Sequence, residues 1–309
     1  MFLLITLLIS FFLFPYSYIK FWSIYKKEGV ATGYGFTAII FIILLSLYYQ
    51  VPNNLLYSLF VIFIFSLIYW FDDFQGLPII LRFLIQFVTG LLIALLIFDQ
   101  SSNYILYSVA AGLLNIILTN ILNFYDGLDL NISLLLLLIS FSVLIVFFND
   151  LIVRYGTLAI IFYLIAFVYF NSKPQSIYLG DSGAFTFASL ITTLVLLKVL
   201  SEINSIVFIA IPISLPAMDI FYVIILRLYL NEKLYTRNYH HLYHVIFYNI
   251  KGYYYLLPQL INFSIIYLLY FLLNNFFEDN FFLIILICVI FTPINYIIIR
   301  KISFLNKDK

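Results

Sequence analysis

Long apolar segments alternate with short polar ones along almost the whole chain. A helix needs about 20 apolar residues to cross the hydrocarbon layer of a membrane. On this basis we predict spanning helices at residues 2–19, 37–51, 55–71, 79–98, 104–122, 131–149, 156–170, 184–200, 205–226, 256–274 and 281–299. The second and seventh segments are the shortest, so the number of spans is about eleven, or ten if one does not cross. The pattern predicts an all-α, polytopic helical bundle, treated as a single domain over residues 1–309.

The composition excludes an ordinary soluble domain. Of the 309 residues, 65% are hydrophobic, 21% are aromatic and only 9% are charged. Helices that are apolar on every side would expose a large apolar surface in water, whereas a bilayer covers it. The chain has no basic block suited to nucleic acid, and its single cysteine, Cys288, excludes an intramolecular disulfide. The first segment lacks a positively charged leader and a small-residue cleavage site, so we interpret it as a retained helix.

The positions of lysine and arginine predict the orientation, because cytoplasmic loops of membrane proteins carry an excess of both. With eleven spans, only Arg154 and Lys198 of the 15 cationic residues fall on one side. Asp150 lies four residues before Arg154 and Glu202 four after Lys198, which gives each cation a local candidate partner. All other cations share the opposite side. We predict that this side is cytoplasmic, with the N-terminus outside and the C-terminus inside.

Polar chemistry is concentrated in the loops predicted to be cytoplasmic. The outer loops are short, whereas the candidate active-site loops lie near residues 26–37, 71–78, 120–129, 171–183 and 227–252. Solubility alone does not require this segregation. It predicts that the cytoplasmic face carries the function.

Two amides and two carboxylates lie within residues 120–129, where one apolar segment ends and the next begins. Asn120 and Asn123 are three apart and would share one face of a helix. Gly127 would let the chain turn and bring Asp126 back toward them. Amide and carboxylate oxygens can hold a hard cation such as Mg²⁺, which in turn binds phosphate. The structural alternative is a polar helix end followed by a turn.

Two adjacent carboxylates, Asp72 and Asp73, follow the third apolar segment in the sequence DDFQGLP, and Arg82 comes shortly after. Such a pair beside a bilayer is costly unless a cation neutralises it or water solvates it. It could bind metal, accept a proton, or lie solvated in a turn. All three interpretations stay open at this point.

The sequence YLGDSG precedes the eighth apolar segment and places glycines on both sides of Asp181. Gly180 and Gly183 allow close backbone approach, and the N–H groups at a helix start favour anions. Asp181 could instead be an ordinary helix N-cap.

All three histidines, His240, His241 and His244, lie in the sequence NYHHLYH, close to Arg237. Imidazole can hydrogen-bond a diphosphate, and arginine adds positive charge. Zinc is less favoured, because the neighbouring loops offer hard oxygen ligands. The structural alternative is an amphipathic, tyrosine-rich segment at the membrane surface.

Taken in order, DDFQGLP, NILNFYDGLD, YLGDSG, P-x-x-D within a helix and HHLYH resemble the motifs of the polyprenyl-phosphate N-acetylhexosamine-1-phosphate transferase family. The resemblance covers roughly residues 20–250. It implies transfer of a sugar-1-phosphate from a UDP-activated amino sugar to a polyprenyl phosphate such as undecaprenyl phosphate, with release of UMP. It also implies Mg²⁺, with Mn²⁺ as the alternative, and a multi-pass protein of the plasma (inner) membrane whose active site faces the cytoplasm.

The resemblance implies a role for each motif. Asn123 and Asp181 would bind Mg²⁺, and Asp72 with Asp73 would lie near the acceptor phosphate. Asp126 would act in nucleotide binding or catalysis. Histidines His241 and His244 would act at the donor diphosphate. We assign further substrate contacts to Asn120, Arg82, Gly180, Arg237 and His240.

Two departures from the family pattern refine these expectations. Tyr243 replaces one histidine of the common His-x-His-His block, and the His-Leu-Tyr order is more similar to the branch that initiates surface polysaccharides, such as the O-antigen of lipopolysaccharide, than to the peptidoglycan lipid-I enzyme. The glycine-rich loop at residues 29–36 lacks the Pro-x-Pro-Arg of many members, so nucleotide contacts of Gly33 and Gly35 are not assigned. The particular sugar and the oligomeric state, with a homodimer as one option, stay open.

The main alternative function is a secondary transporter. Asp219 lies inside the ninth apolar segment, after Pro212 and Pro216. A carboxylate there is costly, so we expect it to face the protein interior and to have a functional or structural partner. It could bind a coupling ion together with the loop acids. Transporters usually place such sites near the bilayer midplane between two related halves, whereas here the acids lie in loops and no repeat is visible. We therefore prefer the enzyme.

Overall fold

The computed structural model describes residues 13–23, 30–98, 104–172, 177–199, 203–233, 239–250, 252–277 and 281–305. These residues are almost entirely helical, apart from turns and one isolated parallel β-bridge between Ala31 and Ile177. The predicted all-α class is therefore confirmed. The chain divides into two compact units, Met1–Ser201 and Glu202–Lys309. Their treatment as one functional domain stays a prediction.

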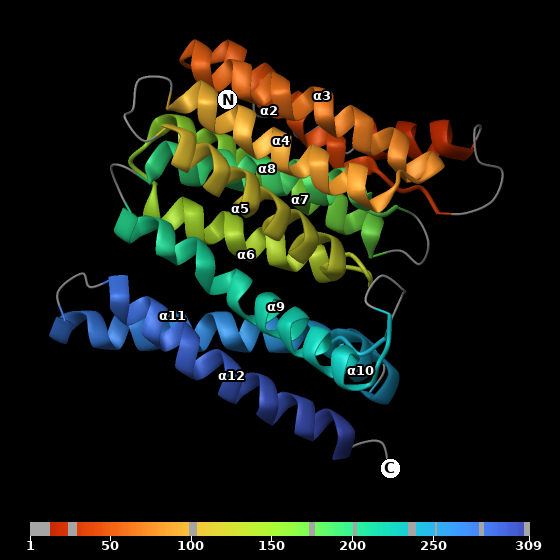
Figure 1. Cartoon of the computed structure of the whole chain (residues 1–309), viewed down its shortest axis with the longest axis vertical. Helices are drawn as coiled ribbons and strands as arrows, with labels where there is room; N and C mark the ends of the chain where they lie inside the picture. Colours follow the sequence, from red (N-terminus) through yellow and green to blue (C-terminus); the bar gives the residue numbers. More distant parts are fainter. Residues whose placement is uncertain are drawn as a thin grey trace. The chain divides into compact units, whose positions relative to one another are not determined.

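The first unit contains a helix at residues 13–23 and the elements that follow it up to residue 199. Figure 1 shows its long helices lying side by side. They are η1 (Tyr34–Phe36), α2 (Thr37–Tyr48), α3 (Asn53–Gln75), α4 (Ile79–Ile97), α5 (Tyr104–Tyr125), α6 (Asn131–Val146), α7 (Leu151–Asn171) and α8 (Gly180–Lys198). Helix α8 packs against α3, α4 and α5. It is also the most buried of the long apolar helices, so its first turn is held on several sides.

Proline and aspartate set the starts of three helices in this unit. Helices α3 and α4 begin directly after Pro52 and Pro78, where the proline ends the preceding extended segment. Asp150 caps α7 by accepting hydrogen bonds from two backbone N–H groups, at 3.0 and 3.1 Å. Its carboxylate also pairs with Lys198 at 2.8 Å. The predicted partner, Arg154, instead donates to the carbonyl of Phe148 at 3.4 Å.

The second unit contains α9 (Ile203–Tyr229), α10 (Leu242–Ile250), η2 (Gly252–Leu256), α11 (Leu257–Phe277) and α12 (Phe281–Leu305). Helices α9, α11 and α12 pack on one another around Ile211, Ile266 and Ile284, each no more than 1% exposed. Helix α9 continues through Pro212 and Pro216. Both prolines lack the backbone N–H that an uninterrupted helix would use, yet neither ends the helix.

Eight described helices are long and apolar enough to span a membrane, and Tyr34–Tyr48 and Asn131–Val146 are shorter apolar helices. The chain is therefore a multi-pass membrane protein. Every predicted segment from the second to the eleventh coincides with a helix, whereas the first is described only at residues 13–23. The short α10 was not predicted as a helix of its own. Eleven spans and an outside N-terminus stay predictions.

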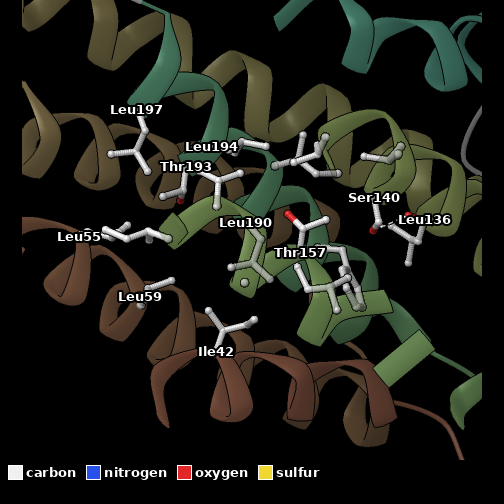
Figure 2. A pocket seen from close by; sticks show the side chains of 18 residues that line it. Ile42, Leu55, Leu59, Leu136, Ser140, Thr157, Leu190, Thr193, Leu194 and Leu197 are labelled. Atoms are coloured by element: carbon white, nitrogen blue, oxygen red, sulfur yellow. Dashed lines mark hydrogen bonds between the residues drawn. The ribbon is translucent and has the colours of Figure 1, made fainter. Parts of the chain in front are cut away.

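An apolar cavity of about 130 Å³ lies within the first unit, between α2, α3, α6, α7 and α8. Figure 2 shows Leu55 and Leu197 at its wall, near the start of α3 and the end of α8. The polar side chains among its lining residues are the hydroxyls of Ser140, Thr157 and Thr193. Because the predicted site residues lie at the opposite ends of α3 and α8, this cavity is separate from the candidate site.

Candidate active site

The side chain of Arg82, in the first turn of α4, joins carboxylates from two other helices. Its Nε and Nη2 atoms contact Asp72 at 2.8 and 2.9 Å, and its Nη1 atom contacts Asp181 at 2.8 Å. The side chain of Asp72 is fully buried, whereas those of Asp181 and Arg82 are 28% and 30% exposed. The interpretation of Asp72 as a solvated turn residue is wrong, because it lies in the last turns of α3 and forms a buried ion pair.

Asp73 is bonded to the first turn of α8. One carboxylate oxygen accepts the N–H of Asp181 at 3.0 Å, and the other accepts the N–H and the hydroxyl of Ser182 at 3.3 and 2.7 Å. Leu179, at the N-cap position, supplies no side-chain hydrogen bond. The alternative interpretation of Asp181 as the N-cap is therefore wrong. Asp73 provides the cap from α3, more than a hundred residues away in sequence.

Asp126, in the turn after α5, is the third carboxylate bonded to this helix start. Its Oδ2 accepts the N–H of Gly180 at 2.9 Å, so the anions held by the N–H groups of α8 are the chain's own carboxylates. Its Oδ1 is buried without a hydrogen-bond partner among the described residues. Burial, and then the nearby charges of Asp181 and Asp73, raise the pKa of Asp126 to about 8. A cation beside Oδ1 would offset this cost.

Glycines bring the early glycine-rich loop into direct backbone contact with α8. Gly180 has a φ of +79°, and a Cβ on it would lie 2.3 Å from the backbone nitrogen of Gly33. A Cβ on Gly35 would lie 2.3 Å from the Cα of Gly183. Only glycine fits these positions, since any side chain would push the two backbones apart. The observed contacts of Gly33 and Gly35 are thus with the first turn of α8, which they help to hold in place.

The two asparagines of α5 approach the cluster through different partners. The side chain of Asn123 lies next to the carboxylate of Asp181, so the structure brings together the two residues predicted to bind Mg²⁺. Asn120 donates to Gln86 at 3.1 Å, and Gln86 donates to the Tyr69 hydroxyl at 2.8 Å. The structural alternative, a helix end followed by a turn, also describes the local backbone. The residue with positive φ in that turn region is Leu130, at 62°, and not the expected Gly127.

The donor atoms of this cluster suit a hard divalent cation. Among the described residues, no three His, Cys, Asp or Glu side chains form a metal site by themselves. Mg²⁺ usually takes one or two protein carboxylates and completes its shell with water and substrate phosphates. Asp181, the amide oxygen of Asn123 and Oδ1 of Asp126 are all hard oxygen donors and fit such a site.

The histidines belong to the second unit, at and just before the start of α10. His241 and His244 are 4% and 5% exposed. The side chain of His240 is 36% exposed and lies 3.2 Å from Glu232. Arg237 lies outside the described residues. The two histidines predicted to act on the diphosphate are thus the buried ones, and His240 is set apart from them.

Helix α10 has a buried and an exposed face. Tyr243 is 4% exposed and its ring stacks on that of His241 at 5.6 Å, whereas Tyr248 is 60% exposed. The amphipathic interpretation therefore describes this helix, with the histidines on its inner side. Asp219, as expected, has an interior partner, because its Oδ2 lies 2.9 Å from Nδ1 of His241.

Several residues at these sites were not predicted from the sequence. Gln86 is a polar residue inside an apolar segment, and Ser182 lies between the two glycines of YLGDSG; both positions were signals that could have been used. Tyr69 gives no such signal, because tyrosine is abundant in this chain. Its role follows only from its contact with Gln86.

The fold and this cluster define a multi-pass membrane protein with a site of carboxylates, amides and a guanidinium at the ends of α3 and α5 and the starts of α4 and α8. Residues 55–199 match the model of the family described as Glycosyl transferase family 4. The chain therefore contains a glycosyl transferase family 4 domain, which occupies slightly less than half of its length. The match includes the whole carboxylate cluster and ends before the histidines. A comparison with curated proteins gives no match.

Proposed function

We propose that the protein transfers an N-acetylhexosamine-1-phosphate from its UDP-linked form to a polyprenyl phosphate such as undecaprenyl phosphate, releasing UMP. The observation that carries this proposal is the convergence of four carboxylates and Arg82 on the start of α8, within the matched region. The reaction would be the first membrane step of cell-surface glycan synthesis. The HHLYH sequence favours the surface-polysaccharide branch, with the site on the cytoplasmic side.

The proposed chemistry is direct attack by the acceptor. A phosphate oxygen of the lipid attacks the donor phosphorus that carries the sugar, and the bond from that phosphorus to the bridging oxygen breaks. The bridging oxygen leaves as part of UMP. A phosphate monoester with a second pKa of about 6 is largely dianionic near neutral pH, so no strong base is needed. Asp72 and Asp73 are bonded to Arg82 and to α8, which supports positioning roles for them instead of a phospho-enzyme.

Arg82 is the group we expect to meet a substrate phosphate. It is partly exposed, and its planar guanidinium is oriented from behind by the buried carboxylate of Asp72. A guanidinium has five N–H donors. Its Nε, Nη1 and Nη2 atoms each face a carboxylate oxygen of Asp72 or Asp181, so the second N–H of each Nη atom is the one that could meet a phosphate. Phosphoryl transfer depends mainly on positioning and charge stabilisation. Asp72 would thus act near the acceptor phosphate through Arg82.

Asn123 and Asp181 are the proposed ligands of Mg²⁺ or Mn²⁺, with Asp126 beside them. When bound, the cation would neutralise oxygens of the donor diphosphate. Asp181 is more exposed than Asp72, which suits a ligand that must meet both cation and substrate. The Asn123 and Asp181 side chains already lie next to each other.

His241 and His244 are proposed to contact the donor diphosphate. They lie within one turn of each other, and the N–H of Val245 bonds to the carbonyl of His241 at 3.0 Å, which fixes their spacing. Substrate contacts of Asn120, Gly180, Arg237 and His240 stay predictions. The transporter alternative gains no support from Asp219, because the bond to His241 accounts for this buried carboxylate.

The proposal is tested by measuring UMP release. Purified full-length protein in lipid nanodiscs is given undecaprenyl phosphate and, one at a time, UDP-N-acetylhexosamines and UDP-hexoses. We expect UMP and a lipid-linked sugar phosphate in equal amounts with an N-acetylhexosamine donor, loss of both with a chelator, and recovery with Mg²⁺. Asp181→Asn should be inactive, while Asp150→Asn, a cap at the start of α7, should not be. UMP formation without lipid product, or turnover unaffected by the chelator, would contradict the proposal.

A further inference from the structure

Asp219, in α9, is fully buried and accepts hydrogen bonds from two other parts of the second unit. Its Oδ1 accepts the N–H of Leu242 and the hydroxyl of Tyr296, each at 2.9 Å. Its Oδ2 lies 2.9 Å from Nδ1 of His241. One carboxylate therefore connects α9 with the histidine sequence and with α12.

Arg300 fixes the direction of the Tyr296 hydroxyl. Its Nη1 donates to the Tyr296 oxygen at 2.7 Å, and a guanidinium can only donate. The single hydroxyl hydrogen of Tyr296 is therefore left for Asp219. Arg300 also donates to the carbonyl of His240 at 3.0 Å, and its guanidinium lies 4.3 Å over the ring of Tyr222. The backbone of the histidine sequence and its carboxylate partner are thus held by one cation of α12.

The contact with Asp219 distinguishes the two ring nitrogens of His241. An ionised Asp219 can only accept, so Nδ1 of His241 must carry its hydrogen. The other ring nitrogen, Nε2, is then the atom that can act on a substrate. Phosphate oxygens also accept, so contact with a diphosphate requires a hydrogen on Nε2 as well. A ring that donates through both nitrogens carries a positive charge, and a carboxylate bonded to it offsets that charge.

We propose that Asp219, Tyr296 and Arg300 are positioning residues for His241. They hold the ring in one tautomer and one orientation, and they supply the negative charge that lets Nε2–H donate to a phosphate oxygen of a nucleoside diphosphate-sugar. The identity of that substrate rests on the proposed function. The positioning network itself is a feature of the second unit, and it gives the C-terminal helix, far outside the matched residues 55–199, a part in the reaction.

Helix α12 offers a matched control for a merely structural role. Thr292 lies one turn before Tyr296, is 2% exposed, and donates its hydroxyl to Ser214 at 3.2 Å. Tyr296→Phe and Thr292→Val each remove one buried hydroxyl from the same helix with little change in shape. Both should lower the unfolding temperature slightly. Only Tyr296→Phe should change His241.

The first measurement uses nitrogen NMR of the full-length protein in detergent, with ¹⁵N-labelled histidine and no substrate. The chain has three histidines, and His240→Gln and His244→Gln assign the signals of His241. We expect Nδ1 of His241 to carry hydrogen, and this signature to change in Tyr296→Phe, Arg300→Gln and Asp219→Asn but not in Thr292→Val. A wild-type spectrum without hydrogen on Nδ1 would overturn the proposal, whether or not the protein is active.

The second measurement separates kcat from KM. Losing an aligned donor typically lowers turnover by about 10²-fold, so Asp219→Asn should lower kcat by about this factor with little change in the KM for the UDP-sugar. Arg300→Lys should recover part of the loss seen in Arg300→Gln. Equal kinetic losses in Tyr296→Phe and Thr292→Val would reduce the network to a structural one and overturn the proposal. If Asp219→Asn does not fold, the kinetic constants of Tyr296→Phe and Arg300→Gln test the proposal in its place. Absence of UMP release by the wild type would instead refute the proposed function, which the substrate-free spectrum does not depend on.

Discussion

Asp73, at the end of α3, caps α8 by bonding to the backbone of Asp181 and Ser182. The residue next to it, Asp72, faces Arg82 instead. Adjacent carboxylates therefore have different tasks: one orders the helix that carries Asp181, and the other orients the cation that contacts Asp181. Each of the two neighbouring carboxylates thus has polar partners of its own, so neither needs to be solvated in a turn beside the membrane.

Removing the cap tests the first of these tasks. Asp73→Ala should lower the free energy of unfolding by about 1 kcal/mol, the usual cost of a lost cap, and should displace Asp181 enough to abolish most UMP release. Asp150→Ala removes a comparable cap from α7 and should cost similar stability while leaving turnover intact. Thermal unfolding in detergent and the UMP assay measure both effects. Equal turnover in the two variants would show that the cap has no part in the reaction.

Asp126 offers a test in which stability and activity move in opposite directions. Its pKa of about 8 means that the folded protein favours the neutral form, because burial penalises the charge. Asp126→Asn keeps an oxygen for the N–H of Gly180 and carries no charge. Unfolding of the metal-free protein near pH 8 should therefore occur at an equal or higher temperature than in the wild type.

The same substitution should lower turnover strongly if Oδ1 serves the bound cation or the nucleotide. The comparison with Asn120→Ala, which breaks the hydrogen bond to Gln86, separates a local polar contact from a role at the cation. A variant that is both less stable and fully active would show that Asp126 is only a structural partner of α8.

The sequence was sufficient to predict the membrane helices and the gathering of the acidic loops at one site, because both follow from local patterns. Apolar length predicted a helix at every α-helix from α2 onward except the short α10, whereas the number of spans stays a prediction. The sequences DDFQGLP, NILNFYDGLD and YLGDSG predicted which carboxylates belong to the site. These signals lie in neighbouring residues and are visible without tertiary structure.

The partners within the site could not be predicted in the same way. Asp73 and Ser182 are 109 residues apart, and Asp219 and Tyr296 are 77 apart. No local pattern specifies which of several carboxylates meets a given N–H or guanidinium. The contact of Gly35 with Gly183 is likewise set by the packing of two backbones. Charge and helix periodicity predict which region of the protein the polar side chains occupy. The packing of the helices determines which donor meets which acceptor.

The predicted orientation can be tested by labelling single cysteines in a Cys288→Ala background. Asn53 and Gln75 are both exposed and lie at opposite ends of α3. Cysteine at Asn53 should react with a membrane-impermeant maleimide on intact cells, and cysteine at Gln75 only after the membrane is opened. Both positions lie on the same helix. Equal expression of the two cysteine variants would therefore show that a difference in labelling does not come from misfolding. The reverse pattern would place the carboxylate cluster outside and exclude a cytoplasmic donor such as a UDP-sugar.

The ion pairs of Arg82 allow its structural and functional roles to be separated. Arg82→Met leaves the buried carboxylate of Asp72 without its partner. Breaking a buried pair costs about 3–5 kcal/mol, and the partial exposure of Arg82 places this case near the lower figure. The partly exposed pair with Asp181 should add less, because solvent screens it. Chemical unfolding in detergent measures the loss.

A second substitution then removes the unpaired charge. Asp72→Asn in the Arg82→Met background leaves no buried charge, so most of the lost stability should return. If Arg82 contacts a substrate phosphate, turnover should stay low in the double variant, since the guanidinium is still missing. Recovery of turnover along with stability would mean that Arg82 serves only to neutralise Asp72, and the phosphate contact would then have to come from another residue.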